Sequence, residues 1–229
     1  MRRYLGEAVC AAARLAFHPA GRNPVWSGIK QGPQESRSVA LTFDDGPSES
    51  TPRLLDVLEK HGVRATFFQC GSNVRRLPQI AREVARRGHE IGNHTFTHAQ
   101  LYWQRVEAIH LEIASTQEAI AETCGAVPAL FRAPFGSRWF GVSSVLRETG
   151  LRMVKWSHDS GDWHFDEKAI VDHATASLHG GAILLFHDAR ALASNPDVTQ
   201  TIRAIDIIIP LLRDQDYAPT PLSVLLAPG

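Results

Sequence analysis

The sequence predicts an α/β fold built on a largely parallel sheet, and two observations support this prediction. From Ser38 onward, short apolar runs typical of buried strands alternate about seven times with amphipathic, helix-like segments. The length of 229 residues suits one large domain, for which a (β/α) barrel is the commonest solution. An open, doubly wound sheet would show the same alternation, so the pattern alone does not decide whether the sheet closes.

Each predicted element follows from local composition. The predicted strands are apolar runs at residues 39–43, 65–70, 90–93, 129–132, 153–156, 182–187 and 222–226. The predicted helices are amphipathic segments at residues 51–60, 73–87, 106–123, 142–149, 166–178 and 198–212. Pro52 suits a first helical turn, where its missing N–H is not needed, and Gly88, Gly125 and Gly150 follow predicted helix ends.

Residues 1–37 form an N-terminal extension ahead of the domain at residues 38–229. Residues 1–17 predict a short amphipathic helix, with an apolar face formed by Leu5, Val9, Ala12 and Ala16. Such a helix would pack on the domain or touch a membrane surface. A cleaved signal peptide is the weaker alternative, because charges interrupt the apolar run and no clear cleavage site follows. Residues 18–37 are rich in Pro, Gly and polar residues and predict an irregular lead-in.

Composition excludes several classes of function. The chain carries 24 basic and 24 acidic residues, so no overall positive field favours nucleic acid. No stretch of about 18 apolar residues predicts a membrane span, which leaves a cytoplasmic or a peripheral, cell-envelope location open. The sequence has no phosphate-binding glycine motif, and its composition does not determine the oligomeric state. The three cysteines are widely spaced, so any metal site must use His and carboxylate ligands.

Polar residues gather where predicted strands end, which is where α/β barrels carry active sites. Asp44 and Asp45 follow the first strand, and a turn at Gly46 would let both carboxylates serve one site. His94 and His98, four residues apart, follow the third strand. Two neutral imidazoles and one carboxylate make a hydrolytic metal site that leaves a position open for water. Taken singly, the aspartates could be helix caps and the histidines could be surface residues.

Three later strands end in similar groups. Arg132 follows the fourth strand and could pair with a carboxylate. Asp162 and Trp163 follow the fifth, where they could orient a histidine and wall a small apolar pocket. His187 ends the apolar sixth strand, a position suited to proton transfer. A solvated arginine and a core histidine are the ordinary alternatives, but five such coincidences at one rim indicate a shared site.

In this order, the motifs resemble those of the polysaccharide deacetylases, the family-four carbohydrate esterases. The matching segments are Thr42–Pro47 (TFDDGP), His94–His98 (HTFTH), Arg132–Gly136 (RAPFG), Asp159–Trp163 (DSGDW) and Leu185–His187 (LFH). The resemblance covers residues 38 to about 227 and implies a distorted (β/α) barrel of about seven strands in a single domain.

The resemblance also implies a site. Asp45, His94 and His98 would bind one divalent metal, usually Zn²⁺, although such N/O ligands also accept Co²⁺ or Ni²⁺. Asp44 would be the general base for metal-activated water and His187 the general acid. The supporting and substrate-binding residues would be Arg132, which holds Asp44; Asp162, which tunes His187; Phe135, through its backbone N–H; and Trp163 and Leu185, which line the pocket for the acetyl methyl group.

The implied activity is removal of N-acetyl groups from N-acetylglucosamine-containing glycans, such as chitin oligomers or peptidoglycan. The alternatives are an O-acetyl-xylan esterase, a hydrolase of small amides, imides or formamides, and a carbohydrate-binding domain without catalysis. The chain departs from the family pattern at Phe135, where Tyr is commoner, and at Ala99, where Pro is commoner. The sequence does not identify the glycan.

Overall fold

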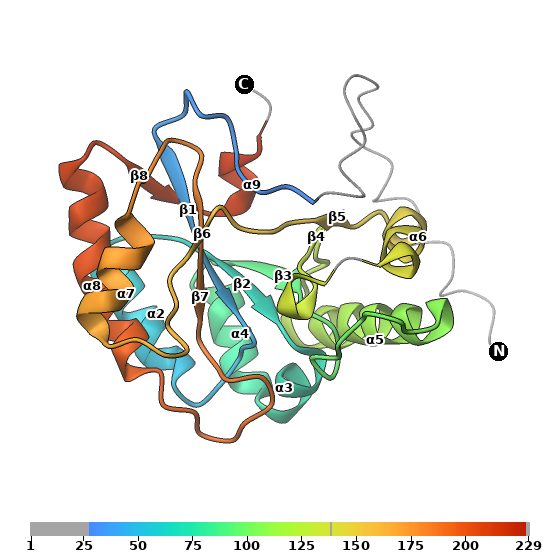
Figure 1. Cartoon of the computed structure of the whole chain (residues 1–229). Helices are drawn as coiled ribbons and strands as arrows, with labels where there is room; N and C mark the ends of the chain where they lie inside the picture. Colours follow the sequence, from blue (N-terminus) through green and yellow to red (C-terminus); the bar gives the residue numbers. More distant parts are fainter. Residues whose placement is uncertain (1–27, 138, 228–229) are drawn as a thin grey trace.

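A computed structural model describes residues 28–137 and 139–227. These residues form eight strands in one sheet, and every strand pairing is parallel. The strands are β1 (Ser38–Asp44), β2 (Thr66–Gln69), β3 (Glu90–Asn93), β4 (Leu130–Phe131), β5 (Arg152–Met153), β6 (His158–Asp159), β7 (Ile183–His187) and β8 (Ala218–Thr220). The sheet curls into an incomplete barrel in the order β5-β4-β3-β2-β1-β7-β6, and β8 adds to the start of β1 (Figure 1). This confirms the predicted single-domain, distorted barrel.

Helices surround the sheet as the alternation predicts (Figure 1). The helices are α2 (Thr51–Lys60), α3 (Gly71–Arg76), α4 (Pro78–Arg86), α5 (Val106–Cys124), α6 (Phe140–Thr149), α7 (Glu167–Thr175), α8 (Thr199–Asp214) and α9 (Leu222–Leu225), with a short 3₁₀ turn, η2 (Pro134–Gly136). Because the strands are parallel, their carboxyl ends share one rim, and the loops leaving them meet there.

The two faces of the sheet carry different residues because side chains alternate along a strand. On the outer face, Phe43 stacks on Phe67 at 5.0 Å and contacts Phe186 at 5.7 Å, beneath α2, α4, α7 and α8. On the inner face, Ala40 and Ile183 pack with residues of α9, and Thr42, Asp44, Leu185 and His187 continue the same two strands towards the rim. The apolar outer core therefore fixes which side chains point into the barrel.

The structure corrects two predicted elements and adds one. The predicted helix at 73–87 is divided into α3 and α4 at Leu77, because Pro78 cannot supply the N–H that a continuous helix needs there. The predicted strand at 222–226 is wrong: this segment forms α9, and the strand lies earlier, at β8. The two-residue strand β6 was not predicted, since its polar sequence His158–Asp159 has no strand signature.

The N-terminal extension at residues 1–37 remains a prediction. Residues 1–27, which include the expected amphipathic helix, lie outside the described residues. Residues 28–37 are largely irregular, and Ile29 forms an isolated parallel bridge with Val154. Among the described residues, no helix has the length and apolarity needed to cross a membrane.

Candidate metal centre and catalytic site

The two aspartates after β1 reach the same site because the backbone changes direction between them. Asp44 ends the strand on the inner face, and Asp45 takes a left-handed conformation with φ of 76°. Successive strand residues would point to opposite faces, so this conformation turns Asp45 back towards the rim. The loop then passes close to Asp188, whose carboxylate would collide with a Cβ at position 46; this explains the glycine there.

Asp45, His94 and His98 form a buried cluster with the donor set of a metal site. Oδ1 of Asp45 lies 3.0 Å from Nε2 of His98 and 3.4 Å from Nε2 of His94. This Oδ1 is buried without a satisfied hydrogen bond among the described residues, whereas Oδ2 accepts one from the backbone N–H of Ala191 at 2.7 Å. One ligand atom from each residue lies within 4.8 Å of the other two, so the residues fit a divalent cation held by one oxygen and two nitrogens.

Electrostatics agree with this assignment. Burial acts to raise the pKa of Asp45, but the close approach of the His94 and His98 imidazoles to its carboxylate lowers it well below its usual range. The carboxylate is therefore ionised at neutral pH. His94 directs Nδ1 to the carbonyl oxygen of Arg132 at 2.8 Å, which leaves Nε2 to face Asp45. Such an outer contact sets the tautomer that a metal-binding imidazole needs.

The loop that carries both histidines is fixed by α5. Glu112 accepts hydrogen bonds from the backbone N–H groups of Phe96 and Thr97, each at 2.8 Å. Thr95 and His98 have positive φ values of 67° and 56°, a conformation that costs a non-glycine residue roughly 1–2 kcal/mol. The carboxylate of Glu112 offsets part of this cost and holds the two imidazoles on one side of the loop.

Asp44 is held by a single buried guanidinium. Arg132 is fully buried, and its Nη1 donates to Oδ1 of Asp44 at 2.7 Å and to Oγ1 of Thr42 at 2.8 Å. Its Nη2 donates to the carbonyl oxygen of Lys155 at 2.9 Å, and its Cζ lies 4.2 Å from the ring centre of Phe68. Burial lowers the pKa of Arg132, while Asp44 opposes this effect. Oδ2 of Asp44 faces the metal cluster, 3.8 Å from Nε2 of His94.

Strand β7 pairs with β1 and brings His187 into register with Asp44. Nδ1 of His187 lies 2.7 Å from Oδ1 of Asp162, and Oδ2 of the same carboxylate accepts from the backbone N–H of His187 at 2.8 Å. Burial acts to lower the pKa of His187, but the Asp162 charge and hydrogen bond raise it overall. The imidazole therefore keeps its proton to higher pH than an ordinary histidine.

Trp163 covers the outer nitrogen of His187. Its Nε1–H donates to Nε2 of His187 at 2.8 Å, and the indole packs edge-on against the imidazole at 4.6 Å. Arg190 lies 4.6 Å above the indole and donates to the backbone carbonyl of Asp162 at 2.6 Å. Because an indole N–H can only donate, Nε2 accepts in this arrangement and Nδ1 carries the proton.

The remaining sequence-predicted residues lie beside these groups. Leu185 is buried on the inner face, two residues before His187. Phe135 lies in η2 with φ of 58°, and its exposed ring contacts the imidazole of His98 at 4.9 Å. Asp159 accepts from the backbone N–H of Gly161 at 3.0 Å, in agreement with a structural role.

Several residues at the site were missed by the sequence reasoning. Thr201, on α8, donates to Asp162 at 2.9 Å, and Asn73, on α3, donates to the carbonyl oxygens of Asp45 and Ala191 at 2.8 and 2.9 Å. Asp188 accepts from Thr51 at 2.6 Å, and burial raises its pKa to about 7. Asp188 directly follows His187, the predicted general acid, so its position in the sequence could have identified it. The others lie on helices, where nothing in their spacing marks them.

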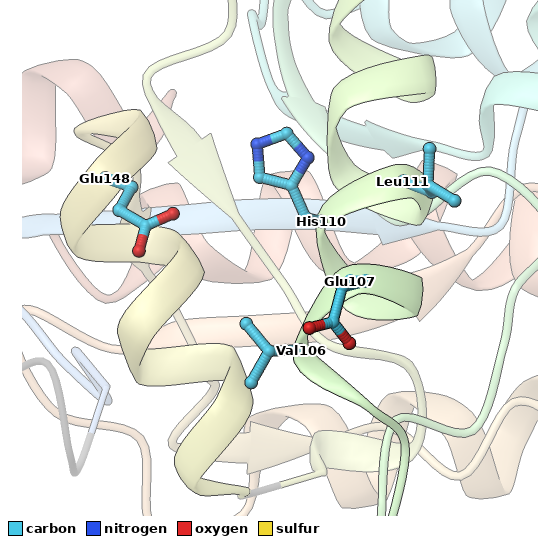
Figure 2. Close-up of a pocket in the computed structure, with 5 residues that line it drawn as sticks. All are labelled: Val106, Glu107, His110, Leu111 and Glu148. Atoms are coloured by element: carbon cyan, nitrogen blue, oxygen red, sulfur yellow. The ribbon is translucent and has the colours of Figure 1, made fainter.

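A separate pocket of about 380 Å³ lies between α5 and α6 (Figure 2). It is lined by Val106, Glu107, His110, Leu111 and Glu148. None of these residues belongs to the metal cluster or to the groups around Asp44 and His187. The predicted site residues at the rim of the barrel therefore lie outside this pocket.

Fold and site together define the class: a distorted (β/α)-barrel protein with the ligand set of a hydrolytic metal centre. Residues 31–154 match the sequence profile described as polysaccharide deacetylase, and the chain belongs to this family. The family is metal-dependent in general, and the Asp45, His94 and His98 cluster suits that requirement.

The chain is similar to proteins with named activities. It is 38% identical over 199 residues to a chitooligosaccharide deacetylase of Bradyrhizobium sp. (strain ANU 289), covering 83% of this chain and 91% of that protein. It is also 38% identical over 169 residues to the peptidoglycan-N-acetylglucosamine deacetylase PgdA of Listeria monocytogenes, covering 72% of this chain but 36% of PgdA. The crystal structure of the peptidoglycan N-acetylglucosamine deacetylase Bc1960 superposes with a TM-score of 0.82 at 31% identity, covering 88% and 93% of the two chains.

Proposed function

We propose that this chain is a metal-dependent hydrolase that removes acetyl groups from N-acetylglucosamine units of a glycan. The relatives named above support the substrate class. The observation that carries the proposal is the pairing of Asp44 and His187 as register partners at the carboxyl ends of β1 and β7. Asp45, His94 and His98 lie beside them at the same rim.

Asp45, His94 and His98 would hold the metal, with Zn²⁺ as the expected ion and Co²⁺ or Ni²⁺ as acceptable substitutes. When bound, a divalent ion at such a site supplies Lewis acidity that polarises a carbonyl and makes water more acidic. The orphaned Oδ1 of Asp45 supports this assignment, because a buried carboxylate oxygen without a satisfied hydrogen bond is costly unless a cation neutralises it.

Asp44 is the proposed general base. Its Oδ1 is occupied by Arg132, whereas Oδ2 faces the cluster and is placed to accept a proton from the attacking water. As that proton moves to Asp44, the water oxygen forms a bond to the amide carbon. Arg132 orients the carboxylate through its hydrogen bond to Oδ1.

His187 is the proposed general acid. An amide nitrogen is a poor leaving group, so the C–N bond breaks readily only when the nitrogen receives a proton. Asp162 stabilises the imidazolium form that holds this proton. The proton must leave from Nε2, which accepts from the indole N–H of Trp163 in this arrangement, so the indole must move away and Nε2 must take up a proton before it can act as the acid. The products are acetate and a free amine.

The acetyl group would occupy the space beside these residues. Leu185 and Trp163 are the proposed walls for its methyl group, and the backbone N–H of Phe135 is the proposed donor to the developing oxyanion. The exposed ring of Phe135 lacks the hydroxyl of a tyrosine, so contacts to the sugar from this position are apolar.

An acetate-release assay tests the proposal. The metal-loaded protein is incubated with chitin oligomers, peptidoglycan, acetylated xylan and small amides, and released acetate is measured. We expect release from N-acetylglucosamine substrates that stops after exhaustive chelation and returns with added Zn²⁺. Faster release from acetylated xylan or from small amides would select one of the alternative activities. Absence of acetate release from every substrate would favour the alternative of a carbohydrate-binding domain without catalysis.

A further inference from the structure

Glu112 of α5 binds the loop at residues 94–98, which carries both histidines of the metal cluster. Its Oε2 accepts hydrogen bonds from the backbone N–H groups of Phe96 and Thr97, each at 2.8 Å, and its Oε1 accepts one from the hydroxyl of Thr97 at 2.7 Å. Two consecutive N–H groups that converge on one oxygen form a nest, a backbone concavity that binds anions. Hydrogen bonds to one side chain therefore fix the middle of the loop.

The carbonyl groups of the same loop are held by α3. The backbone N–H groups of Gly71 and Ser72 donate to the carbonyl oxygens of Thr95 and Phe96, each at 3.0 Å. These contacts satisfy acceptors of the loop, so they cannot take the place of Glu112, which satisfies its donors. Loss of the Glu112 carboxylate would leave two backbone N–H groups without their acceptor and would free the loop to relax on that side.

The loop needs this support because its backbone is strained. Thr95 and His98 have left-handed φ values of 67° and 56°, which residues with a branched or bulky side chain seldom adopt. Thr97 directly precedes His98, whose Nε2 lies 3.0 Å from Oδ1 of Asp45. Relaxation of the backbone at His98 would swing the imidazole away from Asp45, because the side chain turns with the backbone that carries it. The hydrogen bonds to Glu112 oppose this relaxation at the neighbouring residue.

We propose that Glu112 is a positioning residue that sets the affinity of the site for its metal, because it holds His94 and His98 in the ligand-binding arrangement before the ion arrives. Removal of a group that orients metal ligands typically lowers metal affinity by about 10- to 100-fold. Both carboxylate oxygens of Glu112 are engaged by donors of the loop, so the effect should come from hydrogen bonding and not from attraction between the carboxylate and the cation. The inference deepens the proposed function, because it rests on the proposed metal ligands.

The affinity of the full chain for Zn²⁺ tests this inference. Each protein is stripped with a chelator, and its Kd for Zn²⁺ is measured by competition with a chromogenic chelator. Glu112→Ala removes every side-chain hydrogen bond to the loop, whereas Glu112→Gln keeps an oxygen acceptor without the charge. The matched control is Glu118→Ala, because Glu118 is an exposed carboxylate on the same helix that pairs with Arg75 at 3.4 Å.

Glu112→Ala should bind Zn²⁺ about 10- to 100-fold more weakly than the wild type. Glu112→Gln should recover most of this loss, because its amide oxygen can accept from both N–H groups, and Glu118→Ala should match the wild type. Circular dichroism of the chelated proteins separates a misplaced ligand from an unfolded chain. If Glu112→Ala is unfolded, Thr97→Val supplies the test, since it removes the hydrogen bond to Oε1 alone and should weaken Zn²⁺ binding in the same direction.

Wild-type affinity in a folded Glu112→Ala protein, or in Thr97→Val where Glu112→Ala is unfolded, would overturn the inference. Equal losses in Glu112→Ala and Glu112→Gln would assign the effect to charge and overturn it as well, as would a wild-type protein that does not bind Zn²⁺. If the expected affinities are found but no substrate releases acetate, the role of Glu112 stands and the deacetylase proposal fails. If acetate is released while all affinities are equal, the deacetylase proposal stands and the role of Glu112 is overturned.

Discussion

At the scale of single residues, the proposed role of Asp44 depends on the different surroundings of its two carboxylate oxygens. Arg132 occupies Oδ1, and Oδ2 faces the metal cluster. We expect Asp44→Asn to lower kcat by roughly two to four orders of magnitude, the usual span for a general base, because the amide keeps the shape but cannot accept the proton. Metal content, measured by elemental analysis, should stay unchanged. Near-wild-type turnover in Asp44→Asn together with inactive Asp45→Asn would reverse the two assignments.

His187 allows a sharper prediction, because an acid is needed only for a poor leaving group. His187→Ala should slow amide hydrolysis by roughly two to four orders of magnitude. It should slow hydrolysis of an activated acetate ester much less, since that leaving group departs with little protonation. Rates on matched N-acetyl and O-acetyl substrates check this. Equal losses on both would indicate a structural role for His187.

The partner of His187 predicts a pH effect with a definite sign. Burial lowers the pKa of His187, and Asp162 more than compensates for this. In Asp162→Asn the lowering effect of burial is opposed only by the weaker contributions of the Asp45 and Asp44 charges, so the imidazolium loses its proton at lower pH and the alkaline limb of the pH–rate profile should shift to lower pH. Thr201→Val is a useful companion, because it removes a hydrogen bond to Asp162 and keeps the carboxylate. An alkaline limb that stays at the same pH in Asp162→Asn would contradict the proposed pairing of Asp162 with His187.

At the scale of elements, the sequence predicts what periodicity and strand ends encode. The apolar runs of β1 and β7 predict their burial, and the polar residues that follow them meet at one rim because the strands are parallel. Periodicity could not reveal β6, whose two polar residues pair through the backbone alone. It also mistook α9 for a strand, because a four-residue apolar segment fits either period. Supporting groups such as Thr201 and Asn73 depend on how helices pack, which no local pattern specifies.

The turn between α4 and β3 holds a buried histidine, His89, which should make the stability of the fold depend on pH. Burial, with smaller contributions from Arg87 and Arg64, lowers the pKa of His89 to about 4 from its ordinary 6.5. Its Nδ1 accepts from the backbone N–H of Ala65 at 3.2 Å, so the folded protein keeps the imidazole neutral. The unfolded chain binds the proton more readily than the folded protein. The contribution of neutral His89 to the free energy of unfolding is therefore fully present above about pH 6.5 and is lost as the pH falls towards 4.

His89→Asn tests this effect, because the amide oxygen can replace Nδ1 as an acceptor and does not titrate. Between about pH 7 and pH 4.5, the free energy of unfolding of the wild type should fall by about 2–3 kcal/mol more than that of the variant. Denaturant unfolding at both pH values supplies the measurement. Parallel losses in the two proteins would show that His89 is not responsible for the difference.

At the scale of the whole molecule, a metal at the rim would join segments that are distant in the sequence. Asp45 follows β1, whereas His94 and His98 follow β3, and the unfolded chain does not hold these ligands together. An ion that binds only the folded state stabilises it by mass action, by about 2.7 kcal/mol when free metal exceeds Kd a hundredfold. Chelation should therefore lower the Tm of the wild type. The difference should shrink at acidic pH, because protonated imidazoles do not bind metal.

Two variants make this last prediction specific to the cluster. His98→Ala removes a proposed ligand, so its Tm should respond little to metal or chelator. Asp44→Asn leaves all three ligands in place and should show the wild-type shift although it is inactive. Thermal unfolding with and without Zn²⁺, together with elemental analysis, measures both. Equal Tm values for metal-loaded and chelated wild type, with no metal detected, would contradict the assignment. A full shift in His98→Ala would place the metal elsewhere.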